Sequence, residues 1–137
     1  MTQQDQNRAL AIEWMNVAWN RRDDEAVHRM MAPDGVGYSE GRTLTGPLEF
    51  LQFRNELVGA FPDLKIEIVA SVAEGDTVAL RWKVTGTHTG HAMGLAPSGR
   101  QIAPIGSTWM TIRGGQLVEG HDTWNEAAMF ASITAPA

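Results

Sequence analysis

The side chain best suited to chemistry in this sequence is the carboxylate of Asp122, near the end of the last strand-like segment. Two runs rich in β-branched and aromatic residues flank Gly114-Gly115, a dipeptide that supplies the positive φ angles of a two-residue hairpin turn. If the strands pair without interruption from this turn, Ser107 lies opposite Asp122. Asp122, Trp109 and Trp124 then lie on the same face of the hairpin. Because apolar surroundings raise the pKa of a carboxyl group, this arrangement predicts a general acid/base.

The same alternation sends Thr108, Met110, Glu119 and His121 to the opposite face of the hairpin. His121 and Asp122 therefore cannot enter the same cavity. A β-bulge that reversed the facing of the strand would make His121 the rival candidate. A purely structural interpretation is also open, in which Asp122 caps a short C-terminal helix or lies at a solvated strand end.

The four histidines give only a weak indication of metal binding. His88 and His91 lie three residues apart at a strand end and could combine with Asp122, but Gly-Thr-His-Thr-Gly is as easily a turn. We therefore expect no metal site. The sequence has no Gly-x-Ser-x-Gly elbow, phosphate-binding glycine loop or dinucleotide fingerprint.

Composition limits the class of protein and its partners. A chain of 137 residues suits a single domain, which we take as 1–137. The net charge is −5 and Lys and Arg form no basic stripe, which argues against nucleic acid or an anionic membrane as the partner. There is no cysteine, and the polar amino terminus resembles neither a signal peptide nor a spanning segment, so we expect a cytoplasmic protein.

Apolar residues at helical spacing predict three helices before the strands. The first covers about residues 5–20, and Trp14 and Trp19 within it are interpreted as core residues. The second follows Asp23 or Asp24 and ends before Pro33. The third begins at 45–47, carries Phe53 on its apolar side, and ends near residue 60.

From residue 63 the hydrophobic period changes to two, which predicts antiparallel strands joined by hairpins. Trp82, in the second of these strands, is interpreted as core. Residues 35–40 are a weak edge-strand candidate, and 88–100 form a Gly-rich loop suited to a pocket mouth. Helices followed by a strand meander indicate an α+β domain with helices on one face of the sheet.

Four segments follow one another along the chain: Ala60-Phe-Pro-Asp-Leu64, Val84-Thr-Gly-Thr-His-Thr-Gly90, Pro97-Ser-Gly-Arg100 and Gly115-Gln-Leu-Val-Glu-Gly-His-Asp122. In this order they resemble the SnoaL-like polyketide (ester) cyclases of the nuclear transport factor 2-like superfamily. The resemblance covers roughly residues 10–130. It implies a cone-shaped α+β barrel, in which three N-terminal helices pack on a curved, mainly antiparallel sheet around a deep hydrophobic pocket.

The resemblance also implies a reaction and a site. Asp122 matches the family's catalytic aspartate, which performs an aldol-type ring closure of a polyketide ester without metal or organic cofactor. His88 matches the Gly-Thr-His-Thr-Gly segment and could supply a second polar group. We expect the substrate, a small hydrophobic or aromatic molecule, to contact Trp109, Trp124, Ser107 and Phe53.

The expected oligomer is a homodimer through the outer sheet face, the family's usual arrangement, with Met110 and Ile112 on that face. The chain departs from the family at His121, where Trp is common, and at Asn125, where Asp is common. These departures leave the partner of Asp122 open.

Two other functions remain open because the superfamily houses several activities. One is a ligand-binding module without turnover. The other is an isomerase or epoxide hydrolase. An epoxide hydrolase would want an Asp-Arg-Asp set, which Arg81 or Arg100 with Asp122 alone does not complete.

Overall fold

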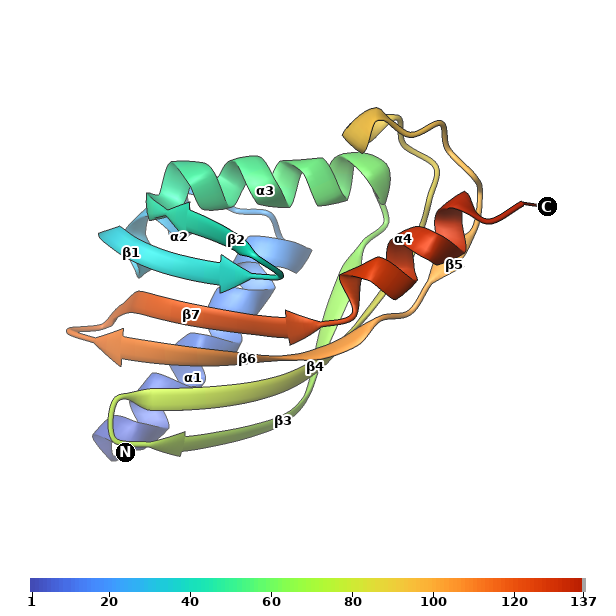
Figure 1. The fold of residues 1–137 in the computed structure, drawn as a ribbon. Coiled ribbons are helices and arrows are strands. Elements are labelled where there is room, and N and C mark those ends of the chain that lie inside the picture. Colours follow the sequence, from blue (N-terminus) through green and yellow to red (C-terminus); the bar gives the residue numbers. More distant parts are fainter. Residues whose placement is uncertain (137) are drawn as a thin grey trace.

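The computed structural model describes residues 1–136 of the chain (Figure 1). Its helical elements are α1 (Gln3–Met15), a π-helix (Asn16–Asn20), α2 (Asp24–Met30), α3 (Gly46–Ala60), a 3-10 helix (Ala92–Gly94) and α4 (Glu126–Thr134). Its strands are β1 (Met31–Ser39), β2 (Arg42–Thr45), β3 (Lys65–Glu74), β4 (Thr77–Thr87), β5 (Gln101–Ile102), β6 (Ile105–Arg113) and β7 (Gln116–Trp124).

Local sequence sets where the first three helices begin. Thr2 and Asp5 form a reciprocal capping box at the start of α1, and the Asp23 carboxylate accepts a 3.1 Å hydrogen bond from the Ala26 amide at the start of α2. Pro47 lies in the first turn of α3, where its missing N–H group is not needed. The predicted cap of the second helix and the start of the third are confirmed.

The strands form a curled mixed sheet in the order β2-β1-β7-β6-β4-β3, with β5 paired to β4. β1 and β7 run parallel, and the other neighbouring pairs are antiparallel. In Figure 1, α1 crosses behind the sheet, α3 runs along one side of it, and α4 follows the end of β7. The predicted α+β cone, with three N-terminal helices on a mainly antiparallel sheet, is confirmed.

The segment expected to be a weak edge strand lies inside the sheet instead. β1 starts at Met31 and pairs on one side with β2 and on the other with β7. Pro33, Gly35 and Gly37 lower its intrinsic strand propensity, so β1 is stabilised by its hairpin ladder with β2 and its non-local ladder with β7. The true edge is β2, which sequence analysis missed, and it follows a tight turn at Glu40-Gly41 with φ angles of 47° and 83°.

The core lies between the helices and the inner face of the sheet. Met110 and Ile112, expected on an outer apolar face, are both 1% exposed and belong to this core. They pack with Val78 and Leu80 of β4. That expectation was therefore wrong, and the reason is the pairing of β6 with β7 described below.

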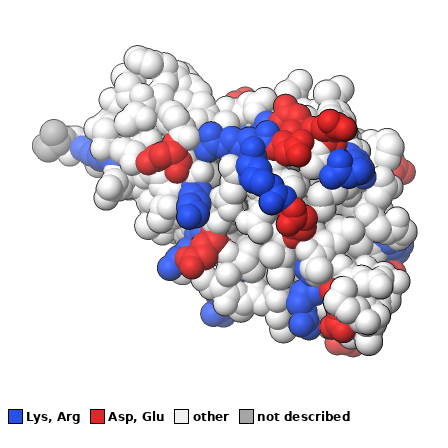
Figure 2. All heavy atoms as spheres, turned by 180° about the vertical axis from the view of Figure 1, so that it is seen from behind, with Lys and Arg blue, Asp and Glu red and all other residues white. Residues whose placement is uncertain are grey.

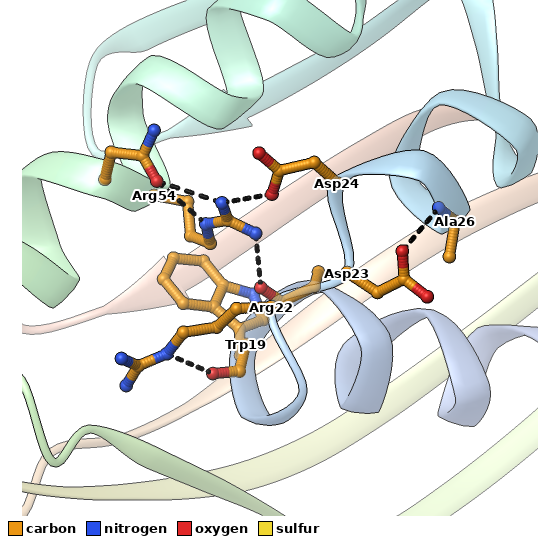
Figure 3. A network of polar contacts seen from close by, with 8 residues as sticks. Trp19, Arg22, Asp23, Asp24, Ala26 and Arg54 are labelled. Atoms are coloured by element: carbon orange, nitrogen blue, oxygen red, sulfur yellow. Dashed lines mark hydrogen bonds and ion pairs between the residues drawn. The ribbon is translucent and has the colours of Figure 1, made fainter.

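The predicted first helix does not remain an α-helix to residue 20, because its last five residues form the π-helix. A buried arginine supports this turn. Arg54 of α3 donates from Nη1 to the Ala18 carbonyl at 3.1 Å and from Nη2 to Asp24 at 2.5 Å (Figure 3). Short π-helical turns inside helices often occur at functional sites, and this one places Trp19.

The surface carries both signs of charge. On the face opposite to that of Figure 1, Lys and Arg alternate with Asp and Glu, and neither sign covers a continuous area (Figure 2). Within residues 1–136, no helix has the length and apolar character needed to cross a bilayer.

Candidate active site

The hairpin that carries Asp122 begins at the predicted turn. Gly114 and Gly115 have φ angles of 58° and 75°, and Arg113 pairs with Gln116. Ile112 then pairs with Leu117, but Thr111 pairs with Glu119. Val118 is thus an extra residue in β7, and the strand has a β-bulge there.

The bulge shifts the pairing beyond it by one residue and changes which side chains share a face. Asp122 now lies opposite Thr108 rather than Ser107, and Trp109 lies opposite His121. Thr108 is 5% exposed on the inner face, whereas Trp109 is 58% exposed on the outer face. Asp122 and Trp124 share the inner face as predicted, but Trp109 and Ser107 do not accompany them.

Two apolar cavities meet at Asp122. The Trp124 cavity is bordered by Trp124 and by residues such as Trp82, Phe61, Leu64, Ile66 and Met129. The Trp14 cavity is bordered by Trp14 and by residues such as Phe50, Met31, Val36, Met110 and Leu117. Five residues border both: Met15, Trp19, Phe53, Thr108 and Asp122. The predicted pocket residues Trp124 and Phe53 thus line the space that Asp122 faces.

A directed pair of hydrogen bonds holds the Asp122 carboxyl. The Trp82 indole N–H donates to Thr108 Oγ1 at 2.9 Å, and Thr108 Oγ1 lies 2.6 Å from Asp122 Oδ1. Because an indole nitrogen can only donate, the Thr108 hydroxyl accepts from Trp82 and donates to Asp122. Asp122 Oδ2 has no hydrogen-bond partner among residues 1–136, so this oxygen remains available to a ligand.

Burial changes the protonation of Asp122. Asp122 is half-buried, because part of its surface borders the cavities, but protein atoms pack closely around its carboxyl. Burial raises its pKa from 3.8 to about 6, against the smaller lowering effects of the Thr108 hydrogen bond and of His121. The nearby Glu40 carboxylate adds a small further rise in this pKa. A carboxyl with this pKa can both accept and return a proton near neutral pH.

Trp124 is held at the edge of the Trp124 cavity by contacts with β1, with the turn that follows β1, and with β4. Its amide donates to Glu40 at 3.0 Å, its indole N–H lies 3.4 Å from the Ser39 hydroxyl, and its ring meets the Trp82 ring edge-on with centroids 6.4 Å apart. These contacts fix the aromatic surface next to Asp122.

Helix α4 borders the same cavity and is tied to the rest of the fold by two arginines. Arg42 of β2 makes a bidentate ion pair with Glu126, with distances of 2.6 and 2.7 Å, and Arg100 donates to the Ser132 carbonyl at 2.7 Å. The Arg42 guanidinium also lies over the Phe53 ring, 5.2 Å from its centroid. Met129 of α4 projects to the cavity.

His88 occupies a different place from the one expected. It is fully buried, its Nδ1 lies 2.9 Å from the Ser98 hydroxyl and accepts from the Ser98 amide at 3.1 Å, and its ring packs 5.4 Å from Phe61. His88 borders neither cavity, whereas Phe61 borders the Trp124 cavity. The geometry therefore assigns His88 to holding the loop after β4, with Nε2 unpaired among residues 1–136.

The other residues that the sequence suggested for chemistry lie outside the two cavities. His121 is exposed on the outer face, where its ring stacks on Tyr38 with centroids 4.8 Å apart. Ser107 borders a groove on the outer face with Arg81 and Ile105. Within the described residues, His88 and His91 belong to no cluster of three or more metal-ligand side chains.

Sequence analysis missed the roles of Thr108 and Trp82 beside Asp122, and that of Trp19 in the cavity wall. An isolated glycine inside a strand, such as Gly120, signals a bulge nearby without giving its position. With the bulge located, parity would have brought Thr108 to Asp122. No signal in the sequence distinguishes Trp19 from an ordinary core residue.

The curled sheet, its helices and the interior cavities define a protein of the cone-shaped α+β class. The sequence profile of the SnoaL-like polyketide cyclases matches residues 9–133. The chain therefore belongs to the SnoaL-like polyketide cyclase family, and the resemblance stated from the sequence is confirmed. A comparison with curated proteins found no match.

Solved structures with this fold include AclR from Streptomyces galilaeus, a candidate hydroxylase, which is 32% identical over 95% of this chain and 82% of its own, with a TM-score of 0.82. IdmH from Streptomyces antibioticus, a candidate polyketide cyclase, is 25% identical over 96% and 99%, with a TM-score of 0.76. A SnoaL-like protein from Jannaschia sp. CCS1 is 23% identical over 98% and 95%, with a TM-score of 0.89, and supports the fold alone.

Proposed function

We propose that this protein is a cofactor-free enzyme that uses Asp122 to move a proton during an aldol-type ring closure of an aromatic or polyketide-like substrate. The observation that carries the proposal is the Asp122 carboxyl, which borders both apolar cavities, with Oδ1 bonded to Thr108 and Oδ2 without a partner among residues 1–136. Membership of the SnoaL-like polyketide cyclase family supports the reaction class.

In the proposed reaction, ionised Asp122 removes a proton from a carbon activated by a neighbouring carbonyl group. The enolate carbon attacks a second carbonyl of the same molecule, which forms the ring bond and leaves an alkoxide. Asp122 returns its proton to that alkoxide, so substrate and product have the same composition. Thr108 binds Oδ1 and thereby presents Oδ2 as the base.

The test compares two acids on β7. Asp122→Asn keeps the shape and a hydrogen-bond acceptor but cannot carry a proton, so turnover should fall by roughly 10²-fold or more while ligand affinity stays near that of the wild type. Glu119→Gln is the matched control, because Glu119 is an exposed acid on the same strand. A screen of aromatic ketones and polyketide intermediates supplies the substrate. Full turnover by the Asp122→Asn variant would refute the proposal.

Two alternatives make different predictions. A ligand-binding module would bind the same aromatic compounds with no conversion by either the wild type or the variant. A hydroxylase, suggested by the description of AclR, would add one oxygen atom to the substrate, whereas cyclisation leaves its mass unchanged. Mass spectrometry of the product separates these outcomes.

The epoxide hydrolase alternative has less support. Arg81 lies at the outer groove and Arg100 is bonded to the Ser132 carbonyl, so neither arginine borders the cavities that Asp122 faces. An epoxide hydrolase of the Asp-Arg-Asp type therefore lacks its arginine beside Asp122.

A homodimer through the outer sheet face remains our proposal for the oligomer. Trp109, Val72 and Ile105 are exposed large apolar residues, and pairing across the sheet places Trp109 and Val72 on either side of Ala79. Covering them would remove apolar surface from water. Sedimentation at micromolar concentration tests this, and a monomer would contradict it.

A further inference from the structure

Asp122 is one of the five residues that border both the Trp124 cavity and the Trp14 cavity, and we call this shared wall the constriction. On the sheet side the constriction consists of Thr108 and Asp122, and on the helix side of Met15, Trp19 and Phe53. A ligand group that reaches Oδ2 therefore has apolar space on two sides.

The free volume of each cavity is small. Each holds about 50 Å³, which is room for a few water molecules. Pockets for small organic ligands are commonly several times larger. A ring system can therefore reach Asp122 only if side chains at the constriction move and join the two spaces.

Trp19 is the side chain at the constriction best placed to move and join the two cavities. Its backbone is fixed, because Arg22 donates to the Trp19 carbonyl at 3.3 Å and Asn20 exchanges two hydrogen bonds with the backbone of Ile66, at 2.8 and 3.0 Å (Figure 3 shows the Arg22 contact). The π-helix thus holds the Cα of Trp19 in place.

The indole of Trp19 is less constrained than its backbone. It meets Phe50 and Phe53 edge-on, with centroids 5.8 and 6.3 Å apart, and its N–H has no hydrogen-bond partner among residues 1–136. A rotation of this ring therefore breaks aromatic contacts of modest strength and no hydrogen bond.

We infer that Trp19, with Phe53, divides the substrate pocket beside Asp122 and sets the size of ligand that the protein accepts. The substrate class is accordingly a molecule with apolar groups on both sides of its reacting carbon, so that one part occupies the Trp124 cavity and the other the Trp14 cavity. This inference rests on the proposed function of Asp122 in one respect, which is that the ligand is called a substrate. Its test measures binding alone.

The test uses two planar probes, 2-naphthol with two fused rings and 1,8-dihydroxyanthraquinone with three, titrated by calorimetry. Trp19→Leu should raise the affinity ratio of the three-ring to the two-ring probe by about tenfold or more, since small changes in apolar pocket space shift selectivity by this order. Trp124→Leu is the matched control, because it removes the same ring from a residue that borders the Trp124 cavity but not the Trp14 cavity. Its ratio should change by less than about threefold.

Equal ratios in the two leucine variants, or an unchanged ratio in Trp19→Leu, would overturn the inference, as would a failure of both probes to bind either variant. If Trp19→Leu does not fold, Phe53→Leu removes the other part of the partition and has the same expected ratio. A crystal structure of the variant with the three-ring probe should show the probe beside Thr108 and spanning both cavities. A probe confined to one cavity would contradict the inference. If the turnover assay refuted the catalytic role of Asp122, these binding results would still stand.

Discussion

Replacement of Asp122 by Asn should change the pH dependence of stability in a direction fixed by burial. The pKa of Asp122 is raised from 3.8 to about 6 in the folded protein, so the folded state holds this proton more tightly than the unfolded state. The stability associated with the neutral carboxyl is fully present below pH 4 and is lost as the pH rises through about 6. Asn is neutral at every pH and avoids this loss.

The size of the effect follows from the pKa change. One pKa unit corresponds to about 1.4 kcal/mol, so the rise at Asp122 corresponds to about 3 kcal/mol, most of which the wild type loses between pH 4 and pH 8. The free energy of unfolding of Asp122→Asn, measured relative to that of the wild type, should therefore be up to about 3 kcal/mol higher at pH 8 than at pH 4. For a domain of this length this corresponds to roughly 10 °C in Tm.

Urea unfolding of both proteins from pH 4 to pH 8 measures the difference, and other titrating groups cancel in the comparison. Glu119→Gln, on the outward side of the same strand, is the control for removing one acid from β7. A wild type that is more stable relative to Asp122→Asn at pH 8 than at pH 4 would refute the reasoning. So would a carboxyl titration of Asp122, followed by carbon NMR, with a midpoint near 3.8.

Three further predictions address the surroundings of the site. Thr108→Val removes the hydrogen bond that lowers the Asp122 pKa, so the NMR titration midpoint should move above its wild-type value, and a downward move would contradict the assignment of the hydroxyl as donor. Arg42→Met leaves the buried Glu126 carboxylate unpaired and should cost about 1–2 kcal/mol in urea unfolding; unchanged amide exchange in residues 126–134 would show that the ion pair does not hold α4. Trp109→Ala should leave the affinity for an aromatic ligand unchanged, because this ring lies on the outer face, and weaker binding measured by calorimetry would place it at the site after all.

Much of the fold follows from patterns that act over a few residues. Helix spacing predicts the first helix, spacing with a cap at Asp23 or Asp24 predicts the second, and the period of two predicts the strands that follow. Gly114-Gly115 predicts the last hairpin because few other residue pairs adopt its backbone angles. Alternation within one strand also places Asp122 with Trp124, since this relation does not depend on the partner strand.

The relations between separate segments were decided only by tertiary structure. The bulge at Val118 is a property of two strands packed together, and it exchanges Ser107 and Trp109 for Thr108 beside Asp122. In the same way β1 is stable because β2 and β7 pair with both of its edges. The sequence alone thus determined which residue types form the strands and that Asp122 shares a face with an aromatic ring. The hydrogen-bond partner of that carboxyl depended on a one-residue shift in register between β6 and β7, which the pattern of either strand alone does not specify.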